Sequence, residues 1–214
     1  TGQGMFDNST FVDQGPNALT VTATGAPVYS GLSPFGNTYP GSVLLNGTSQ
    51  YLSAPSNAAF DLGSSSFTVE AWVNPSAFNA YGYAVASRYA FSGSGSGWLF
   101  RISATILQFV RGNDIVLTGT ISASVGTWYH VAAVRNGSTL TLYLNGTQVA
   151  QATSIANFTD AATTLQIGST HTIPDYANGY TSNLRIVKGT AVYTANFTPP
   201  TSLATRSQAL ARQW

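Results

Sequence analysis

The clearest pattern of hydrophobic and polar positions runs from residue 127 to residue 152, where apolar side chains recur at every second position. In residues 139–144 three leucines fall on one face, and two threonines and a tyrosine fall on the other. An Asn-Gly pair stands at each end of this segment, at 136–137 and 145–146. Asn-Gly accepts positive φ at both central positions of a type I′ turn. The pattern therefore predicts three antiparallel strands joined by two tight turns.

The same alternation predicts further strands along the chain. Residues 66–74, SFTVEAWVN, place apolar side chains on one face. Residues 42–45 and 50–54 are expected to form a hairpin about the Asn-Gly pair at 46–47, and residues 55–62 one helical turn. The other expected strands are 6–12 at an edge, 18–24, 84–88, 97–103, 106–111, 115–118, 164–168 and 179–187, with strand-like or turn segments at 190–193 and 197–199. This series predicts an all-β fold, a two-sheet antiparallel jelly-roll sandwich.

Composition narrows the class of protein. Hydrophobic residues make up 43% of the 214 residues, with 11 Tyr, 11 Phe and 4 Trp, which is enough for a core in one large domain. The net charge of +1, with 7% charged residues, argues against a nucleic-acid binder. Cysteine is absent, which excludes disulfides and thiol catalysis. No apolar run approaches the roughly 18 residues that a membrane-spanning helix needs, so we expect no membrane insertion.

Several segments resemble one family. SVLLNGTSQYLSAP followed by SSSFTVEAWVNPS, and TWYHVAAVRNGSTLTLYLNGTQVA, resemble strands of laminin G-like (concanavalin A-like) jelly-roll domains. NLRIVKGTAVYTANFTPP is similar to the variant found in tail and surface proteins of marine bacteriophages. The resemblance implies a jelly-roll domain over residues 1–203 that is displayed outside cells or on virions. Residues 204–214 have no counterpart and are expected to form a C-terminal tail.

Some enzymes with a similar fold are glucanases, and these place Glu, Asp and Glu at alternate positions of one strand. Retaining glycoside hydrolysis needs two carboxylates about 5–5.5 Å apart. Here Glu70, the one glutamate of the chain, is flanked at those positions by Thr68 and Trp72. We interpret Glu70 as a structural acceptor beside Trp72, and His130 as a structural residue between strands. The sequence contains no G-x-S-x-G motif. It predicts that the protein is not an enzyme.

Calcium is the one candidate cofactor. Related pentraxins and laminin G domains bind Ca²⁺ through carboxylate and carbonyl oxygens. The matching stretches here, 90–97 and 169–178, contain a single acid, Asp175, which argues against a pentraxin-like site. A calcium site would have to use Asp175, or Asp114 with Asn113, together with main-chain carbonyl oxygens.

Sugar-binding surfaces combine aromatic rings with amide, carboxylate or guanidinium groups. Loops and adjoining strand ends, expected at one end of the sandwich, supply the candidate ligand-binding residues: Tyr81, Tyr83, Arg88, Tyr89, Trp98, Asn113, Asp114, His171, Asp175 and Tyr176. Among them Trp98 begins an alternating strand, a position that favours the core. Tyr89 and Tyr176 stand among Gly, Ser and Asn residues, which favours exposure.

Two functions follow from these observations. The first is a non-enzymatic recognition module for glycan binding and adhesion, a lectin-like part of a phage tail or other extracellular surface protein, whose partner is a glycan or cell-surface receptor. The alternative is a structural domain of a virion or surface assembly that contacts other subunits. A glycoside hydrolase is a distant third. The expected location is extracellular or on a virion.

Overall fold

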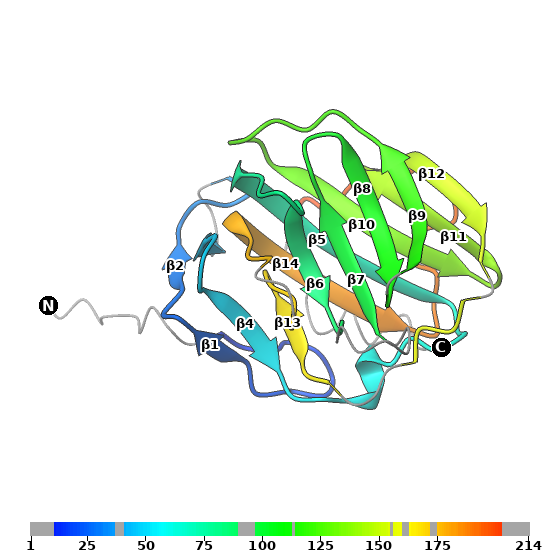
Figure 1. The fold of residues 1–214 in the computed structure, drawn as a ribbon, viewed down its shortest axis with the longest axis horizontal. Helices are drawn as coiled ribbons and strands as arrows, with labels where there is room; N and C mark the ends of the chain where they lie inside the picture. Colours follow the sequence, from blue (N-terminus) through cyan, green and yellow to red (C-terminus); the bar gives the residue numbers. More distant parts are fainter. Residues whose placement is uncertain are drawn as a thin grey trace, which may run out of the picture.

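Two antiparallel seven-stranded sheets pack face to face in the computed structural model, which describes residues 11–36, 41–89, 97–112, 114–154, 156–159, 163–171 and 175–202. The first sheet contains, in spatial order, β1 (Thr22–Thr24), β4 (Tyr51–Ala54), β13 (Leu165–Ile167), β6 (Tyr83–Ser87), β7 (Trp98–Ile102), β8 (Ile106–Arg111) and β9 (Asp114–Thr120). The second contains β12 (Thr147–Thr153), β11 (Thr139–Leu144), β10 (Tyr129–Asn136), β5 (Phe67–Ala77), β14 (Asn178–Lys188), β3 (Ser42–Asn46) and β2 (Val28–Ser30). The first sheet crosses over the second in Figure 1, which confirms the predicted jelly-roll sandwich.

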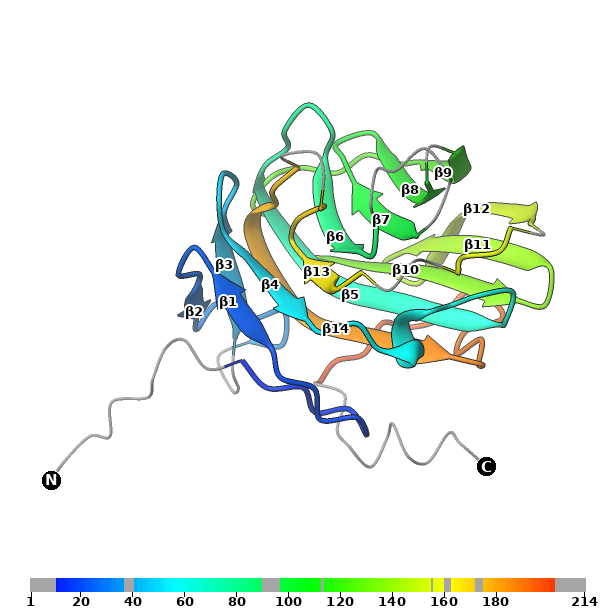
Figure 2. The ribbon, with the colours of Figure 1, turned by 60° about the horizontal axis from the view of Figure 1, so that its bottom comes forward.

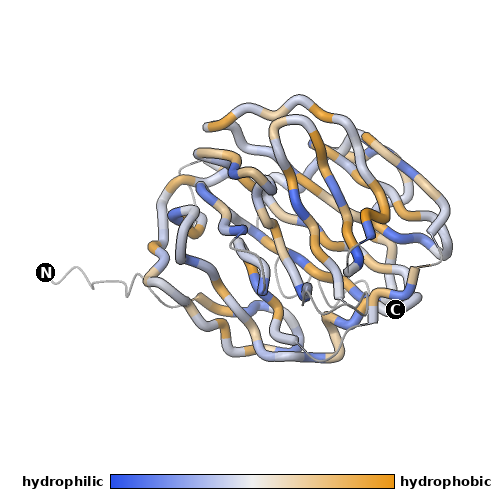
Figure 3. Tube along the Cα trace, in the orientation of Figure 1, coloured by the Kyte–Doolittle hydropathy of each residue, from blue (hydrophilic) through white to orange (hydrophobic). Residues whose placement is uncertain are grey.

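The core lies between the sheets and follows the period-2 pattern. On β5 the side chains of Phe67, Val69, Ala71 and Val73 are fully buried. The ring of Phe67 stacks on a phenylalanine of β8, with ring centroids 5.4 Å apart. Hydrophobic and polar positions alternate along the strands of both sheets (Figure 3). Each strand therefore turns one face to the core and leaves the other for the outer surface of its sheet.

The predicted meander is present, with a difference in its first turn. Asn145 and Gly146 have φ values of 50° and 76°, which confirms the predicted pair of positive φ angles at the second turn. At the first turn Asn136 belongs to β10 and pairs with Thr139, and Gly137 takes positive φ. The two-residue loop is therefore Gly137-Ser138, because glycine alone suits the first central position of a type II′ turn.

The hairpin predicted for residues 42–54 is wrong. β3 pairs with β2 and β14 in the second sheet, whereas β4 pairs with β1 and β13 in the first. The side-chain oxygen of Asn46 accepts hydrogen bonds from the N–H groups of residues 48–50 at 3.0–3.1 Å. This turn carries the chain from one sheet to the other. The helical turn expected within residues 55–62 is a 3₁₀ turn at Ala58–Phe60.

The chain after β14 crosses the outer face of the second sheet (Figure 2), and we call residues 189–202 the strap. The segments expected at 190–193 and 197–199 form no strand. Val192 N–H donates to the Thr68 hydroxyl at 2.9 Å, and Phe197 N–H donates to the carbonyl of Gly146 at 2.9 Å. Apolar strap residues also pack on β10 and β11. The predicted tail, 204–214, lies outside the described residues. In the part of the chain that the structure describes, no helix has the length and hydrophobicity to cross a membrane.

Candidate functional site

The candidate ligand residues are divided between the two ends of strands β6 to β9. Tyr81 precedes β6 at one end, where Asn79 and Gly82 form a β-bridge. At the other end Trp98 pairs with Arg111, which pairs in turn with Asp114. The expectation of a single cluster at one end of the sandwich is therefore wrong. Asn113 lies outside the described residues.

Three of the candidates are structural residues of the interior. Trp98 is fully buried, and its indole N–H donates to a main-chain carbonyl at 3.0 Å. Tyr83 is also fully buried, with its hydroxyl 2.8 Å from that of Thr181, and burial raises the pKa of Tyr83. Arg88 is 1% exposed and donates to the carbonyls of Asn57 and Thr163. These side chains hold the fold together and are closed to a ligand, which contradicts their choice as ligand candidates and, for Trp98, confirms the core position that its strand favoured.

Three further candidates have separate surroundings. Tyr89 is 4% exposed in a small apolar cluster on the outer face of the first sheet, so the exposure that its sequence neighbours favoured is wrong. Asp114 is 68% exposed and forms an ion pair of 3.2 Å with Arg111. The Nε2 atom of His171 lies 2.8 Å from the carbonyl oxygen of Thr164. The contacts of these residues give no evidence of a shared binding surface.

Asn79 joins the remaining candidates into one surface. Its side-chain oxygen accepts the N–H groups of Tyr81 and Gly82, each at 2.8 Å, and so fixes the turn between β5 and β6. Its side-chain N–H₂ donates to Asp175 Oδ1 at 2.9 Å and to the carbonyl of Tyr176 at 3.1 Å. One amide thus couples this turn to the segment that enters β14. Arg101 of β7 donates to the side-chain oxygen of Gln108 at 2.8 Å, and its charge acts on Asp175. We call Asn79, Tyr81, Arg101, Asp175 and Tyr176 the Asp175 surface.

The Asp175 surface combines exposed rings with a buried carboxyl group. Tyr81 is 51% exposed, and the half-buried ring of Tyr176 lies against that of Tyr51 with centroids 6.4 Å apart. The side chain of Asp175, next to Tyr176 in the chain, is 1% exposed. Burial raises the pKa of Asp175, and the Asn79 hydrogen bond and the charge of Arg101 offset this only in part. The exposed groups can stack on and hydrogen-bond to a ligand, while Asp175 positions Asn79.

The sequence analysis missed Asn79 and Arg101, and each left a signal. Arg101 stands between the core residues Phe100 and Ile102, so the period-2 pattern of β7 places it on the outer face of the sheet. Asn79 begins the sequence Asn-Ala-Tyr-Gly between two strands, and asparagine is typical of the first position of a turn.

The prediction of a calcium site at Asp175 remains a prediction. One oxygen of Asp175 already accepts a hydrogen bond from Asn79. Among the described residues no group of three or more His, Cys, Asp or Glu side chains is placed to hold a metal ion.

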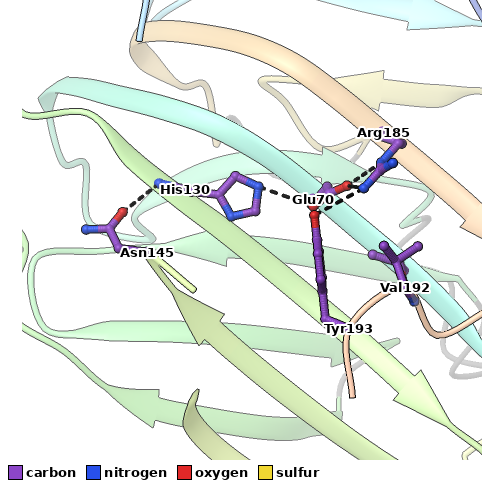
Figure 4. Close-up of polar contacts among 7 residues, drawn as sticks. Glu70, His130, Asn145, Arg185, Val192 and Tyr193 are labelled. Atoms are coloured by element: carbon purple, nitrogen blue, oxygen red, sulfur yellow. Dashed lines mark hydrogen bonds and ion pairs between the residues drawn. The ribbon is translucent and has the colours of Figure 1, made fainter. Parts of the chain in front are cut away.

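Glu70 lies under the strap on the second sheet (Figure 4) and is 2% exposed. The guanidinium of Arg185 contacts its Oε1, and the Nε2 atom of His130 lies 3.2 Å from its Oε2. Arg185 also donates to the hydroxyl of Tyr193 at 3.2 Å. Burial alone would raise the pKa of Glu70, but His130, Arg185 and Tyr193 together lower it below its usual value. The contacts confirm the interpretation of Glu70 as a structural acceptor.

A comparison with protein families decides where the chain belongs. The family model Laminin_G_3, described as the concanavalin A-like lectin/glucanases superfamily, matches residues 46–192. The chain belongs to this superfamily. No curated protein matches the sequence.

Solved structures of this superfamily's fold are similar to the chain at low sequence identity. Domain 4 of AbnA, a GH43 extracellular arabinanase from Geobacillus stearothermophilus solved with arabinotriose, is 16% identical with a TM-score of 0.61, over 90% of this chain and 87% of that one. The binding domain of Paraclostridial Mosquitocidal Protein 1 is 13% identical with a TM-score of 0.66, and the match covers 88% of this chain and 48% of that one. A structure of botulinum neurotoxin type C, a toxin whose cell entry depends on interaction with two ganglioside molecules, is 17% identical with a TM-score of 0.62. The match covers 86% of this chain and 46% of that one. The chain therefore spans about half the length of the two toxin chains.

Proposed function

We propose that the protein is a non-enzymatic recognition module that binds a glycan at the Asp175 surface. The observation that carries this proposal is that the Asn79 amide links two tyrosines that reach the surface, the exposed Tyr81 and the half-buried Tyr176, close to Arg101, whose charge acts on Asp175. Tyrosine faces stack on the C–H groups of sugars, and guanidinium groups donate hydrogen bonds to sugar oxygens.

Two further observations support a binding role over a catalytic one. The carboxyl group of Glu70, the one glutamate of the chain, is buried and contacts Arg185 and His130. The similar structures include a domain solved with arabinotriose and a toxin that interacts with gangliosides. We propose that this module acts outside the cell as part of a surface protein. The sequence of residues 183–200 favours a phage tail protein as the larger protein to which the module belongs.

A glycan array probed with the wild-type protein and with single variants tests the proposal. Tyr176→Ala removes one ring, and Asp175→Asn removes the charge beneath Asn79. We expect Tyr176→Ala to lower the affinity for the bound glycans at least about tenfold, because a stacked aromatic ring and its buried area are lost. Asp114→Asn, at the far end of β6 to β9, is the matched control and should leave the array unchanged.

The array is read in calcium and in EDTA, since a calcium ion at Asp175 would make binding depend on the metal. Absence of binding to every glycan, or binding that survives Tyr176→Ala, would contradict the proposed site. Stable oligomers that need residues 204–214, in a protein that binds no glycan, would favour the structural role instead. Release of reducing ends from β-glucans would show catalysis.

A further inference from the structure

The outer face of the second sheet carries a hollow of about 250 Å³ beside the strap. Its floor consists of outward-facing residues on neighbouring strands: Val134 pairs with Thr141, and Tyr143 follows Thr141 on the same face of β11. Gln151 of the edge strand β12 pairs with Thr141 on the other side. Tyr193 of the strap forms the facing wall. We call this feature the Thr141 hollow.

The floor of the Thr141 hollow is fixed before any ligand arrives. Val134, Thr141 and Tyr143 are 1%, 5% and 2% exposed, so packing holds their side chains in place. The side-chain N–H₂ of Gln151 donates to the Thr141 hydroxyl at 3.1 Å. On the opposite wall the ring of Tyr193 stacks on a phenylalanine of the strap, with centroids 3.5 Å apart and planes at 3°. A preformed site of this kind needs little ordering when it binds.

The chemistry of the lining is neutral. The polar groups are the hydroxyls of Thr139, Thr141, Tyr143 and Thr194 and the amides of Asn136 and Gln151, and no charged side chain is among the described residues that line the hollow. The hydroxyl of Tyr143 is protonated at neutral pH, and burial raises its pKa further from that range. Hydroxyls and amides both donate and accept hydrogen bonds, as sugar hydroxyls do. An ionic ligand would lose water here without gaining a counter-charge.

We propose that the Thr141 hollow binds a single ring of a neutral sugar. Its volume is below the roughly 300–1,000 Å³ of pockets for drug-sized ligands, and so suits one monosaccharide unit. The half-buried ring of Tyr193 offers an apolar contact for the C–H groups of the sugar, while Thr141 and Gln151 hydrogen-bond to its hydroxyls. The hollow lies on the other sheet from Arg101 of the Asp175 surface, so this site is independent of the one proposed above.

Titration of the ¹⁵N-labelled protein with neutral methyl glycosides of glucose, galactose, mannose and arabinose, followed by NMR, tests this site. N-acetylneuraminic acid serves as the charged comparison. We expect the amide signals of residues 134–143 and 151 to shift with at least one neutral glycoside, with a dissociation constant on the order of 1 mM for so small a ligand. The charged sugar should leave these signals in place.

Variants separate this site from a general surface effect. Thr141→Val keeps the side-chain shape and removes one hydroxyl, which should raise the dissociation constant at least about fivefold. Thr118→Val is the matched control, because the Thr118 hydroxyl accepts from Gln108 at 2.9 Å on the other sheet. Gln151→Leu, at an exposed position, repeats the test if Thr141→Val disturbs the fold.

Tyr176→Ala should leave the sugar-dependent shifts at the Thr141 hollow unchanged, so a failure of the proposed function and a failure of this inference are told apart. Two results would overturn the inference. One is the absence of shifts around Thr141 with every neutral glycoside. The other is shifts that persist with the same dissociation constant in both Thr141→Val and Gln151→Leu.

Discussion

Replacing Glu70 with glutamine removes the negative charge from a buried cluster and leaves its shape nearly unchanged. Glu70, His130 and Arg185 have side chains that are 3%, 2% and 14% exposed. In the variant the guanidinium of Arg185 keeps the Tyr193 hydroxyl as a neutral acceptor, but its carboxylate partner is gone. A cation is then left in a largely dry environment under the strap.

The expected loss of stability is large for a single polar substitution. Removing one partner of a buried ion pair costs about 3–5 kcal/mol, and the lower end applies here because glutamine still accepts a hydrogen bond. For a chain of this length a loss of about 3 kcal/mol corresponds to a fall of about 6–12 °C in Tm. Asp114→Asn breaks a pair whose acid is 68% exposed, and we expect a loss below about 1 kcal/mol from this control.

Urea unfolding of the wild type and both variants, followed by circular dichroism between pH 3 and pH 8, measures these effects. The pKa of Glu70 is lower in the folded protein than its usual value of about 4.3. The ionised carboxylate therefore stabilises the fold above about pH 4.3, and this contribution is lost as the pH falls through the folded pKa. The difference between wild type and Glu70→Gln should be full at neutral pH and shrink in acid. A variant as stable as the wild type at pH 7, or a difference that grows in acid, would refute the reasoning.

Three further predictions concern other parts of the fold. Gly146→Ala would place a Cβ atom against the strap at a φ of +76°, whereas the Cβ atom of Gly137→Ala, at a φ of +57°, meets nothing within 4 Å. Urea unfolding should therefore show a loss of stability of about 1–2 kcal/mol for Gly137→Ala and at least twice that for Gly146→Ala. Since burial raises the pKa of Asp175, its ionised form destabilises the fold. Asp175→Asn should therefore gain stability relative to wild type as the pH rises from about 4 to 7. A loss of stability over that range would contradict the destabilising effect of the buried charge. Tyr83→Phe leaves the Thr181 hydroxyl without its partner and should cost about 1–3 kcal/mol of stability. In a double-mutant cycle the added change Thr181→Val should restore most of this loss. A double variant no more stable than Tyr83→Phe would contradict the role of this hydrogen bond.

The strands were predictable because their signal is local. Alternation along β5, β10 and β11 depends only on neighbouring residues, and it placed Phe67 and Leu140 correctly in the core. The pairing of β3 and β4 was not predictable in the same way. An Asn-Gly turn is typical of a hairpin, but here each strand has one partner from a distant part of the chain, β14 for β3 and β13 for β4.

The site was harder to predict because exposure depends on what packs against a residue. Trp98 and Arg88 have the chemistry of ligand groups, yet the 3₁₀ turn at Ala58–Phe60 and the loop before β13 supply carbonyls that hold both in the interior. Asp175 and Tyr176 were predicted as ligand-binding residues, and this remains a prediction. Their link to Asn79 spans 96 and 97 residues of sequence, and no periodicity within a single segment reveals such a contact.

A crystal structure of the protein soaked with its best array ligand tests the central claim most directly. We expect an intact sugar that stacks on Tyr176 and hydrogen-bonds to Arg101, with Glu70 still paired to Arg185 under the strap. Sugar density confined to another part of the molecule would contradict the proposed site, and a cleaved glycan lying against a carboxyl group would contradict a purely binding role.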